Sequence, residues 1–90
     1  MLIIKYHSSF KKDYKRIEKR GYDTRKLSEI INILANEKTL SEKHRDHYLS
    51  GNYIGCKECH ITNDWLLIYE IDESERTLYL TRTGTHSDLF

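Results

Sequence analysis

The stretch 56–69 limits most strongly what this chain can fold into. Residues 56–62 alternate polar and apolar side chains, whereas residues 65–69 are almost wholly apolar. Asn63 and Asp64 stand between the two runs, where a tight turn would be placed. This pattern predicts a β-hairpin whose first strand has one solvated face and whose second strand is central in a sheet.

The first strand of this hairpin brings ionisable side chains together. Residues two apart on a strand share a face, so Glu58 and His60 project to the same side, with Asp64 just beyond. Two carboxylates, an imidazole and Trp65 at one end of a hairpin exceed what a sheet needs to stay folded. We therefore take this end of the hairpin as the candidate functional site.

The length and composition favour one thin domain over residues 1–90. The chain has 90 residues, of which 38% are hydrophobic and 32% are charged, so it can build a single core only. No apolar run approaches the roughly 20 residues of a membrane span, and residues 1–5 are too short for a signal peptide. We expect a cytoplasmic protein with one sheet and helices on one face of it.

The spacing of Cys56 and Cys59 matches part of a metal or redox motif. Three positions apart on a strand, the two thiols would point to opposite faces and could not share one ion. A second pair of ligands at such a spacing is also lacking. We expect reduced, buried or half-buried thiols, no metal site and no cofactor; a zinc protein built on His and Cys is the weaker alternative.

Positive charge is concentrated in the first half of the chain. Residues 1–48 hold 12 Lys and Arg against 7 Asp and Glu, whereas residues 49–90 hold 3 against 7. A basic half of this kind attracts phosphates or an acidic protein partner.

Residues 2–6 predict a first strand and residues 8–20 a first helix. Ser8 or Ser9 can cap this helix, and Gly21 ends it. Phe10, Tyr14 and Ile17 recur at helical spacing as the buried stripe. The opposite face is basic and carries Lys11, Lys12, Lys15, Arg16, Lys19 and Arg20. A solvated surface and contact with phosphate are about equally good explanations for this basic face.

The remaining segments complete the expected order of elements. Asp23 can cap a second helix, in which Leu27, Ile30, Ile31 and Leu34 form an apolar stripe. Periodicity is lost over residues 37–52, which we expect to be a polar loop. After a turn at residues 72–75, residues 77–82 predict the last strand of an antiparallel meander, while the position of the first strand in the sheet stays open.

Residues 46–90 carry motifs that occur together in a known family. They are Asp46-His47, Leu49, Gly51, Gly55, His60, the strand Asp64-Trp65-Leu66-Leu67-Ile68-Tyr69, and the ending Arg82-Thr83-Gly84-Thr85-His86 with Leu89-Phe90. With the order strand–helix–helix–three strands, this combination resembles the RelE superfamily of bacterial type II toxins, and within it the YafQ branch. The resemblance implies a RelE-like α+β domain: an antiparallel sheet of about four strands with two N-terminal helices packed on one face.

The resemblance also implies a function. A member of this branch would be a metal-independent endoribonuclease that cuts messenger RNA on the ribosome, by attack of the 2′-hydroxyl on the adjacent phosphate, and so inhibits translation. Its partners would be the ribosome, messenger RNA and a cognate acidic antitoxin, with which it would form a hetero-oligomer.

The resemblance assigns roles to single residues. His47, His60, Asp64 and His86 correspond to catalytic positions, Arg82 to a phosphate-contacting position and Phe90 to one near the active site, while Glu58 stands where the branch usually has Asp. Trp65 and Lys57 are further candidates for RNA contact, although a core position is the simpler interpretation of Trp65. Lys11, Lys15, Lys19 and Arg20 are the candidates for contact with the antitoxin or ribosomal RNA.

These residue types suit the implied reaction. Attack by a 2′-hydroxyl needs a base for one proton and an acid for the leaving 5′-oxygen, and histidine can serve as either. A guanidinium offers forked donors to phosphate oxygens, and an aromatic ring can hold an unstacked base. A module that binds RNA or the ribosome without cutting is the main alternative, and discrete cut sites on a translated message would separate the two.

Overall fold

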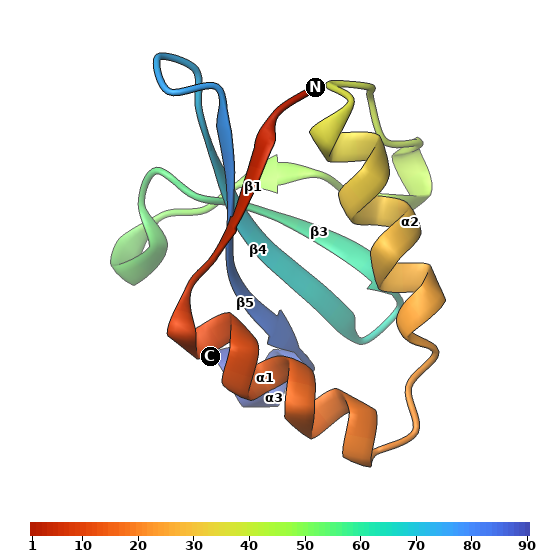
Figure 1. Cartoon of the computed structure of the whole chain (residues 1–90). Helices are drawn as coiled ribbons and strands as arrows, with labels where there is room; N and C mark the ends of the chain where they lie inside the picture. The colour runs from red at the N-terminus through yellow and green to blue at the C-terminus, as the bar shows by residue number, and fades with distance from the viewer.

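Five strands form one sheet in the order β1-β5-β4-β3-β2 in the computed structural model, which describes all 90 residues (Figure 1). The strands are β1 (Ile3–Tyr6), β2 (His47–Tyr48), β3 (Lys57–Thr62), β4 (Trp65–Asp72) and β5 (Thr77–Gly84). The helices are α1 (Ser8–Lys19), α2 (Thr24–Ala35) and α3 (His86–Leu89), with two 3-10 helices, η1 (Glu42–His44) and η2 (Gly51–Tyr53). The predicted α+β class and the antiparallel β3-β4-β5 meander are confirmed.

The sheet differs from the prediction in its strand count. The additional strand is β2, which pairs antiparallel with β3 so that His47 lies opposite Glu58. Two residues are too few to display the period of a strand, so the sequence pattern indicated only a loop there. The first strand, whose place was open, lies at the edge of the sheet, parallel to β5, with Ile4 opposite Leu78.

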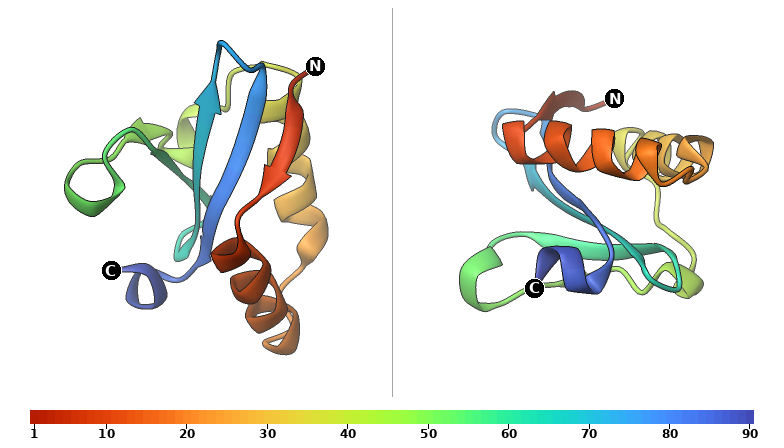
Figure 2. Two further views of the ribbon diagram at one scale, coloured as in Figure 1. Left: turned by 60° about the vertical axis from the view of Figure 1, so that its left-hand side comes forward. Right: turned by 90° about the horizontal axis from the view of Figure 1, so that it is seen from below.

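Helices α1 and α2 cover one face of the sheet, and α3 lies on the other side with the loop that contains η2 (Figure 2). The main core lies under α1 and α2 and includes Phe10, Ile17, Leu27, Ile30, Leu34, Leu67, Tyr69, Leu78 and Leu80. The predicted stripes therefore do face the sheet, as the helical spacing indicated. None of the helices combines the length and the apolar character needed to cross a membrane.

The ends of the helices follow the prediction only in part. Asp23 caps α2 by accepting a hydrogen bond from the backbone N–H of Arg25. The predicted serine cap of α1 is wrong, because His7 occupies that position and makes no capping hydrogen bond. Ser9 instead donates to the carbonyl oxygen of Thr81, 2.7 Å away on β5.

A second, smaller apolar cluster lies on the face away from α1 and α2. Leu66, Ile68 and Leu89 form it, and Cys56 packs against it. Cys59 belongs to the main core, so the two thiols lie on opposite faces, as their spacing predicted.

An irregularity in β5 decides where Arg82 points. Ile68 pairs with Arg82 but the next residue, Tyr69, pairs with Leu80, so Thr81 is an extra residue in the ladder. A β-bulge of this kind changes which face the following side chains occupy. Arg82 therefore shares the face of Ile68, whereas regular alternation after Leu80 would turn it into the main core.

Candidate functional site

A buried carboxylate and two imidazoles form the centre of the site. Glu58 on β3 is 6% exposed, and its Oε2 lies 3.2 Å from His47 Nε2 on β2. The same Oε2 lies 3.9 Å from Nε2 of His60, two residues further along β3. The predicted common face of Glu58 and His60 is confirmed, and the unpredicted strand β2 adds His47 to it.

The backbone fixes which nitrogen of each imidazole carries a proton. His47 Nδ1 lies 2.5 Å from the carbonyl oxygen of Arg45, and His60 Nδ1 lies 3.3 Å from that of Asn63. A carbonyl oxygen only accepts hydrogen bonds, so both Nδ1 atoms are donors and both Nε2 atoms face Glu58. Arg45 has a left-handed φ of 46°, an uncommon conformation for a residue with a side chain.

The contact between His47 and Glu58 needs a proton on one of the two side chains. With Nδ1 protonated, a neutral His47 would turn the lone pair of Nε2 toward the carboxylate at 3.2 Å. That contact is favourable only when a proton lies on His47 Nε2 or on Glu58. The other oxygen, Glu58 Oε1, is buried and has no hydrogen-bond partner. Burying such an oxygen costs free energy, so its presence here indicates a functional role.

His44 supports the strand segment that carries His60. β2 pairs only with Lys57 and Glu58, so the edge of β3 beyond them is open. His44 Nδ1 donates to the carbonyl oxygen of His60 at 2.7 Å. This hydrogen bond replaces the one that a neighbouring strand would give to that carbonyl. The sequence showed His44 only as one polar residue in a loop.

Asp64 and His86 meet at the turn end of the hairpin. The backbone N–H of His86 donates to Asp64 Oδ1 at 3.1 Å, so Asp64 holds the start of α3. The His86 ring is exposed and lies 4.9 Å from the ring of Phe90 between centroids. Phe90 is 57% exposed, so its ring is accessible and is not buried against the sheet.

Helix α3 is also tied to α1. Thr85 and Asp88 form a capping box at its start, and Arg20, at the C-cap of α1, donates to both oxygens of Asp88, at 2.6 and 3.0 Å. These hydrogen bonds hold the pKa of the Asp88 carboxyl well below its usual range. Arg20 is thus engaged within the molecule, although it stays exposed, and its contact with the antitoxin or ribosomal RNA stays a prediction.

Arg82 is held by a partner that the sequence did not indicate. Its Nε and Nη2 donate to the two oxygens of Asp13 on α1, at 2.6 and 3.1 Å, and its Nη1 donates to the hydroxyl of Tyr53 at 3.3 Å. Hydrogen bonds with Asp13 raise the pKa of Arg82 above its ordinary value, so the guanidinium stays charged. Neither Asp64 nor Glu58 pairs with it.

Two of the predicted RNA contacts are wrong in position. Trp65 is 3% exposed, and its indole N–H donates to Thr83 in the core at 2.9 Å, so neither ring face is free to stack on a base. Lys57 alternates with Glu58 along β3 and therefore projects to the opposite face, where it pairs with Asp46 at 2.9 Å.

The three lysines of the basic helix that are candidates for contact with the antitoxin or ribosomal RNA are free of ion pairs. Lys11, Lys15 and Lys19 are exposed, and none forms an ion pair. Lys11 and Lys15 border a groove of about 550 Å³ between α1 and α2, whose lining includes Tyr6, Phe10, Tyr14, Leu27 and Ile31. Glu18 also lines the groove, so its charged lining holds two lysines against one carboxylate; with its apolar floor, this suits an acidic, amphipathic segment.

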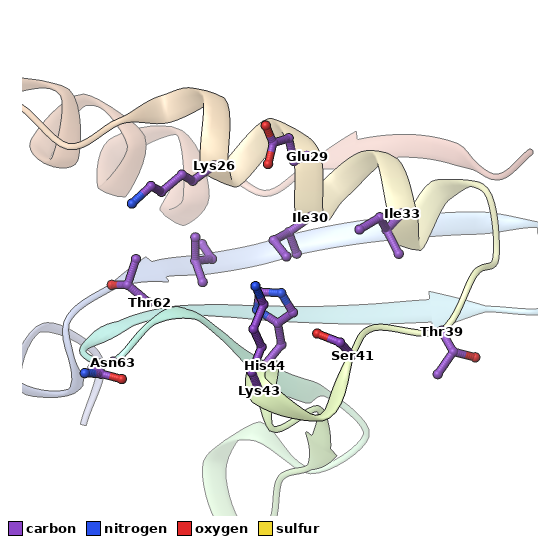
Figure 3. A pocket seen from close by; sticks show the side chains of 11 residues that line it. Lys26, Glu29, Ile30, Ile33, Thr39, Ser41, Lys43, His44, Thr62 and Asn63 are labelled. Atoms are coloured by element: carbon purple, nitrogen blue, oxygen red, sulfur yellow. The ribbon is translucent and has the colours of Figure 1, made fainter.

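The largest hollow of the molecule is not the site. A cleft of about 660 Å³ lies between α2 and the segment around η1, with Lys26 and Ile30 on one side and His44 on the other (Figure 3). Neither this cleft nor the other hollows are lined by Glu58, His60 or Arg82. Glu58, His60 and Arg82 thus lie outside the hollows, whereas Asp64 lines a smaller hollow of about 260 Å³.

Asp13 and Tyr53 are the residues that sequence reasoning missed. A signal for Asp13 was present, because it lies on the same side of α1 as Phe10 and Ile17 and is buried with them. A carboxylate on the apolar side of a helix requires a buried partner. No comparable signal marks Tyr53, which comes directly after the predicted loop of residues 37–52.

Comparisons with known proteins agree with the fold and the residue pattern. Residues 2–90 match the family described as bacterial toxin of type II toxin–antitoxin system, YafQ. The chain is 36% identical over 88 residues to the mRNA interferase toxin YafQ of Escherichia coli, covering 97% of this chain and 94% of that protein.

Solved structures give the same result. A metal-bound toxin from Helicobacter pylori is 42% identical with a TM-score of 0.94, and all of both chains is covered. The toxin in the E. coli DinJ–YafQ complex is 35% identical with a TM-score of 0.90, covering 100% of this chain and 99% of that one. In the present structure no group of three or more His, Cys, Asp and Glu side chains is arranged to hold a metal ion.

Proposed function

This chain belongs to the YafQ family of type II toxins, and from that premise we propose that it is an mRNA interferase that cuts messenger RNA on the ribosome. One observation carries the proposal. Two imidazoles turn their Nε2 atoms toward the buried Glu58 carboxylate, on the same face of the sheet as Arg82, with His86 at the nearby end of the hairpin.

The proposed reaction is attack of a 2′-hydroxyl on the adjacent phosphate. His60 accepts the hydroxyl proton as the base, and the Glu58 carboxylate stabilises the positive charge of the imidazolium that forms. The 2′-oxygen forms a bond to phosphorus as the bond to the 5′-oxygen breaks. His86 gives its proton to that 5′-oxygen, which leaves a 2′,3′-cyclic phosphate and a 5′-hydroxyl. Both proton transfers use side chains, so the scheme needs no metal ion.

The positions of the two ends of this reaction are compatible with one phosphate between them. His60 pairs with Leu66, and Leu66 pairs with Gly84, two residues before His86. Two strand spacings separate His60 from Gly84, or about 10 Å. Asp64 holds the backbone of His86 and would thereby direct its ring. Arg82 lies one row away, opposite Ile68, and would bind the non-bridging oxygens.

The position of Glu58, His60 and Arg82 outside the hollows of the molecule supports a role for the ribosome. In-line attack requires the 2′-oxygen, phosphorus and 5′-oxygen to be roughly collinear, and free RNA adopts this geometry only in part of its ensemble. Side chains that lie outside a cleft cannot impose it alone. The decoding site of the ribosome already holds messenger RNA in an extended form, and the toxin would add the acid, the base and Arg82.

An acidic antitoxin is the proposed inhibitor. The E. coli YafQ is known in complex with DinJ, and we propose that the partner of this chain places an acidic amphipathic segment in the groove between α1 and α2. Lys11 and Lys15 at the rim, with Lys19 on the same helix, would attract that segment. Such a complex would be a hetero-oligomer.

Cleavage in a translation system made of purified components tests the proposed function. Primer extension on a translated message should show discrete new ends with the wild type, and none when the ribosome is left out. The RNA fragments should end in a cyclic phosphate and a 5′-hydroxyl. A soluble, folded wild type that stalls ribosomes without creating new ends would instead support a binding module.

A further inference from the structure

Asp13 stands at the junction of α1, β5 and the candidate site. The residue is 2% exposed, yet its side chain accepts three hydrogen bonds, from Arg82 Nε, Arg82 Nη2 and the backbone N–H of Thr83. Burying a carboxylate this deeply costs desolvation free energy, which its hydrogen-bond and ion-pair partners must offset. Here the hydrogen-bond partners are one guanidinium and one strand edge, and the guanidinium of Arg16 lies 3.8 Å from Asp13 Oδ1 as a second positive charge.

The strand edge explains why α1 can place a carboxylate there. β1 stops pairing with β5 at Tyr6 and Leu80, so the edge of β5 is open beyond that point. Ser9 and Asp13 take over: Ser9 bonds to the carbonyl oxygen of Thr81 and Asp13 to the N–H of Thr83. Residues four apart on a helix are about 6 Å apart, close to the spacing of two residues along a strand.

The same contact leaves part of the Arg82 guanidinium free. A guanidinium has five N–H donors in a rigid plane. Two of them go to Asp13 and one to the hydroxyl of Tyr53, which leaves two without a protein partner. The Arg82 side chain is 24% exposed, whereas that of Asp13 is 3% exposed, so the free donors belong to a group anchored from within.

We infer that Asp13 is a positioning residue for the reaction: together with Tyr53 it fixes the plane of Arg82 before RNA arrives and directs the two free N–H donors at the reacting phosphate. This inference rests on the proposed function. Donors fixed in place need no reorganisation as charge develops on the phosphate, and this is where electrostatic stabilisation is most effective. A lysine in place of Arg82 could neutralise Asp13, but it lacks the planar guanidinium that presents a second pair of N–H donors to the phosphate.

Single-turnover cleavage by ribosome-bound toxin tests the inference with Asp13→Asn. The side-chain amide of the asparagine replaces one carboxylate oxygen by an NH2 group, which faces the N–H donors of Arg82 or Thr83 and cannot accept from them. The guanidinium then loses its fixed plane. We expect the cleavage rate to fall about 10²-fold, as for misplacement of a reacting group by about an ångström, with ribosome affinity unchanged. Glu18→Gln is the matched control, because it removes an exposed, unpaired carboxylate from the same helix, and it should cut at the wild-type rate.

A second comparison separates positioning from mere structural support. If Asp13 acts through Arg82, then adding Asp13→Asn to Arg82→Gln should slow cleavage no further, because the group that Asp13 positions is already gone. Multiplied losses would show that Asp13 acts elsewhere, and would overturn the inference. So would a folded Asp13→Asn protein that cuts at the wild-type rate.

Tyr53→Phe covers the case in which Asp13→Asn does not fold. It removes the hydroxyl that accepts from Arg82 Nη1 at 3.3 Å and donates to the carbonyl oxygen of Leu89 at 3.4 Å, from a half-buried position. We expect a loss of about three- to tenfold in rate, the size of one hydrogen bond, and an unchanged rate would overturn the inference. A wild type that makes no cuts would end the proposed function and this inference together, whereas active wild type with unaffected variants ends this inference alone.

Discussion

His86 is the residue whose replacement should separate binding from chemistry. Its ring is exposed and only its backbone N–H bonds to Asp64, so His86→Gln should keep the fold and the affinity for antitoxin. Without a proton for the leaving 5′-oxygen, single-turnover cleavage should fall by about 10²–10⁴-fold. Near-normal cleavage would mean that the acid is misassigned.

His7→Gln provides the matched control for this measurement. His7 is also exposed, but it precedes α1 and packs beside Tyr79, away from the hairpin turn. It should cut and arrest growth as the wild type does, whereas expression of His86→Gln should be tolerated.

Cys59 should matter for stability and not for cleavage. Its side chain is fully buried in the main core, and burial raises the pKa of the thiol far above its ordinary value, so it stays protonated and unreactive. Cys59→Ser would bury a hydroxyl without a prepared partner, at a cost of about 1–3 kcal/mol in the free energy of unfolding. Denaturant titration measures this loss; an unchanged midpoint would contradict the burial argument, and Cys59→Ala is the control for volume alone.

At the residue scale, sequence reasoning indicated the groups to which we assign the chemistry, but not the groups that hold them in place. His60 and Glu58 follow from alternation along a strand, and Arg82 and His86 from a motif. Asp13 and Tyr53 stand 69 and 29 positions from Arg82, and no periodicity specifies such pairings. Trp65 and Lys57 are next to the site residues Asp64 and Glu58 in the sequence, but adjacent residues on a strand project to opposite faces of the sheet.

At the scale of elements, α1 organises the site from behind. Its Asp13 holds Arg82, and Arg20 at its C-cap holds Asp88, so this helix and its end set the position of both β5 and α3. The helix stripes and the hairpin were predictable because their periods are strong. The place of β1, the two-residue β2 and the bulge at Thr81 were not, since each depends on which strands meet.

The ion pair between Arg20 and Asp88 should stabilise α3 in a pH-dependent way. Because the pKa of Asp88 is lower in the folded protein, its contribution is fully present above the ordinary pKa of Asp, about 3.9. It is lost as the pH falls through the lower folded value. Asp88→Asn should thus lower Tm at neutral pH, with the difference from wild type shrinking below about pH 4.

Backbone amide exchange localises this effect. Replacing Asp88 should speed exchange at the N–H of Phe90, which bonds to His86 within α3, while amides of β4 keep their protection. Uniformly faster exchange across the sheet would show that the pair supports the whole fold and not α3 in particular.

At the scale of the whole molecule, the uneven charge distribution should control how fast the antitoxin arrives. The net charge is only +1, yet Lys11, Lys15 and Lys19 stand unpaired along one helix beside the α1/α2 groove. Exposed charges of this kind act mainly by steering the encounter, and less by holding the complex. Changing all three to Glu should lower the association rate constant at low salt by at least tenfold, with a smaller effect on dissociation.

The control for this experiment must match the change in total charge. Lys26, Lys38 and Lys43 are likewise exposed, but they lie toward the cleft on the other side of α2 or in the loop after it. Their replacement by Glu changes the net charge equally, so any larger effect of the α1 variant reports position and not total charge. Stopped-flow association over a range of salt concentrations distinguishes the two, because steering weakens as the Debye length shortens from about 30 Å at 0.01 M to about 8 Å at 0.15 M. If both triple variants associate equally slowly at low salt, the antitoxin recognises the net charge of the toxin, and the groove beside α1 is not its docking site.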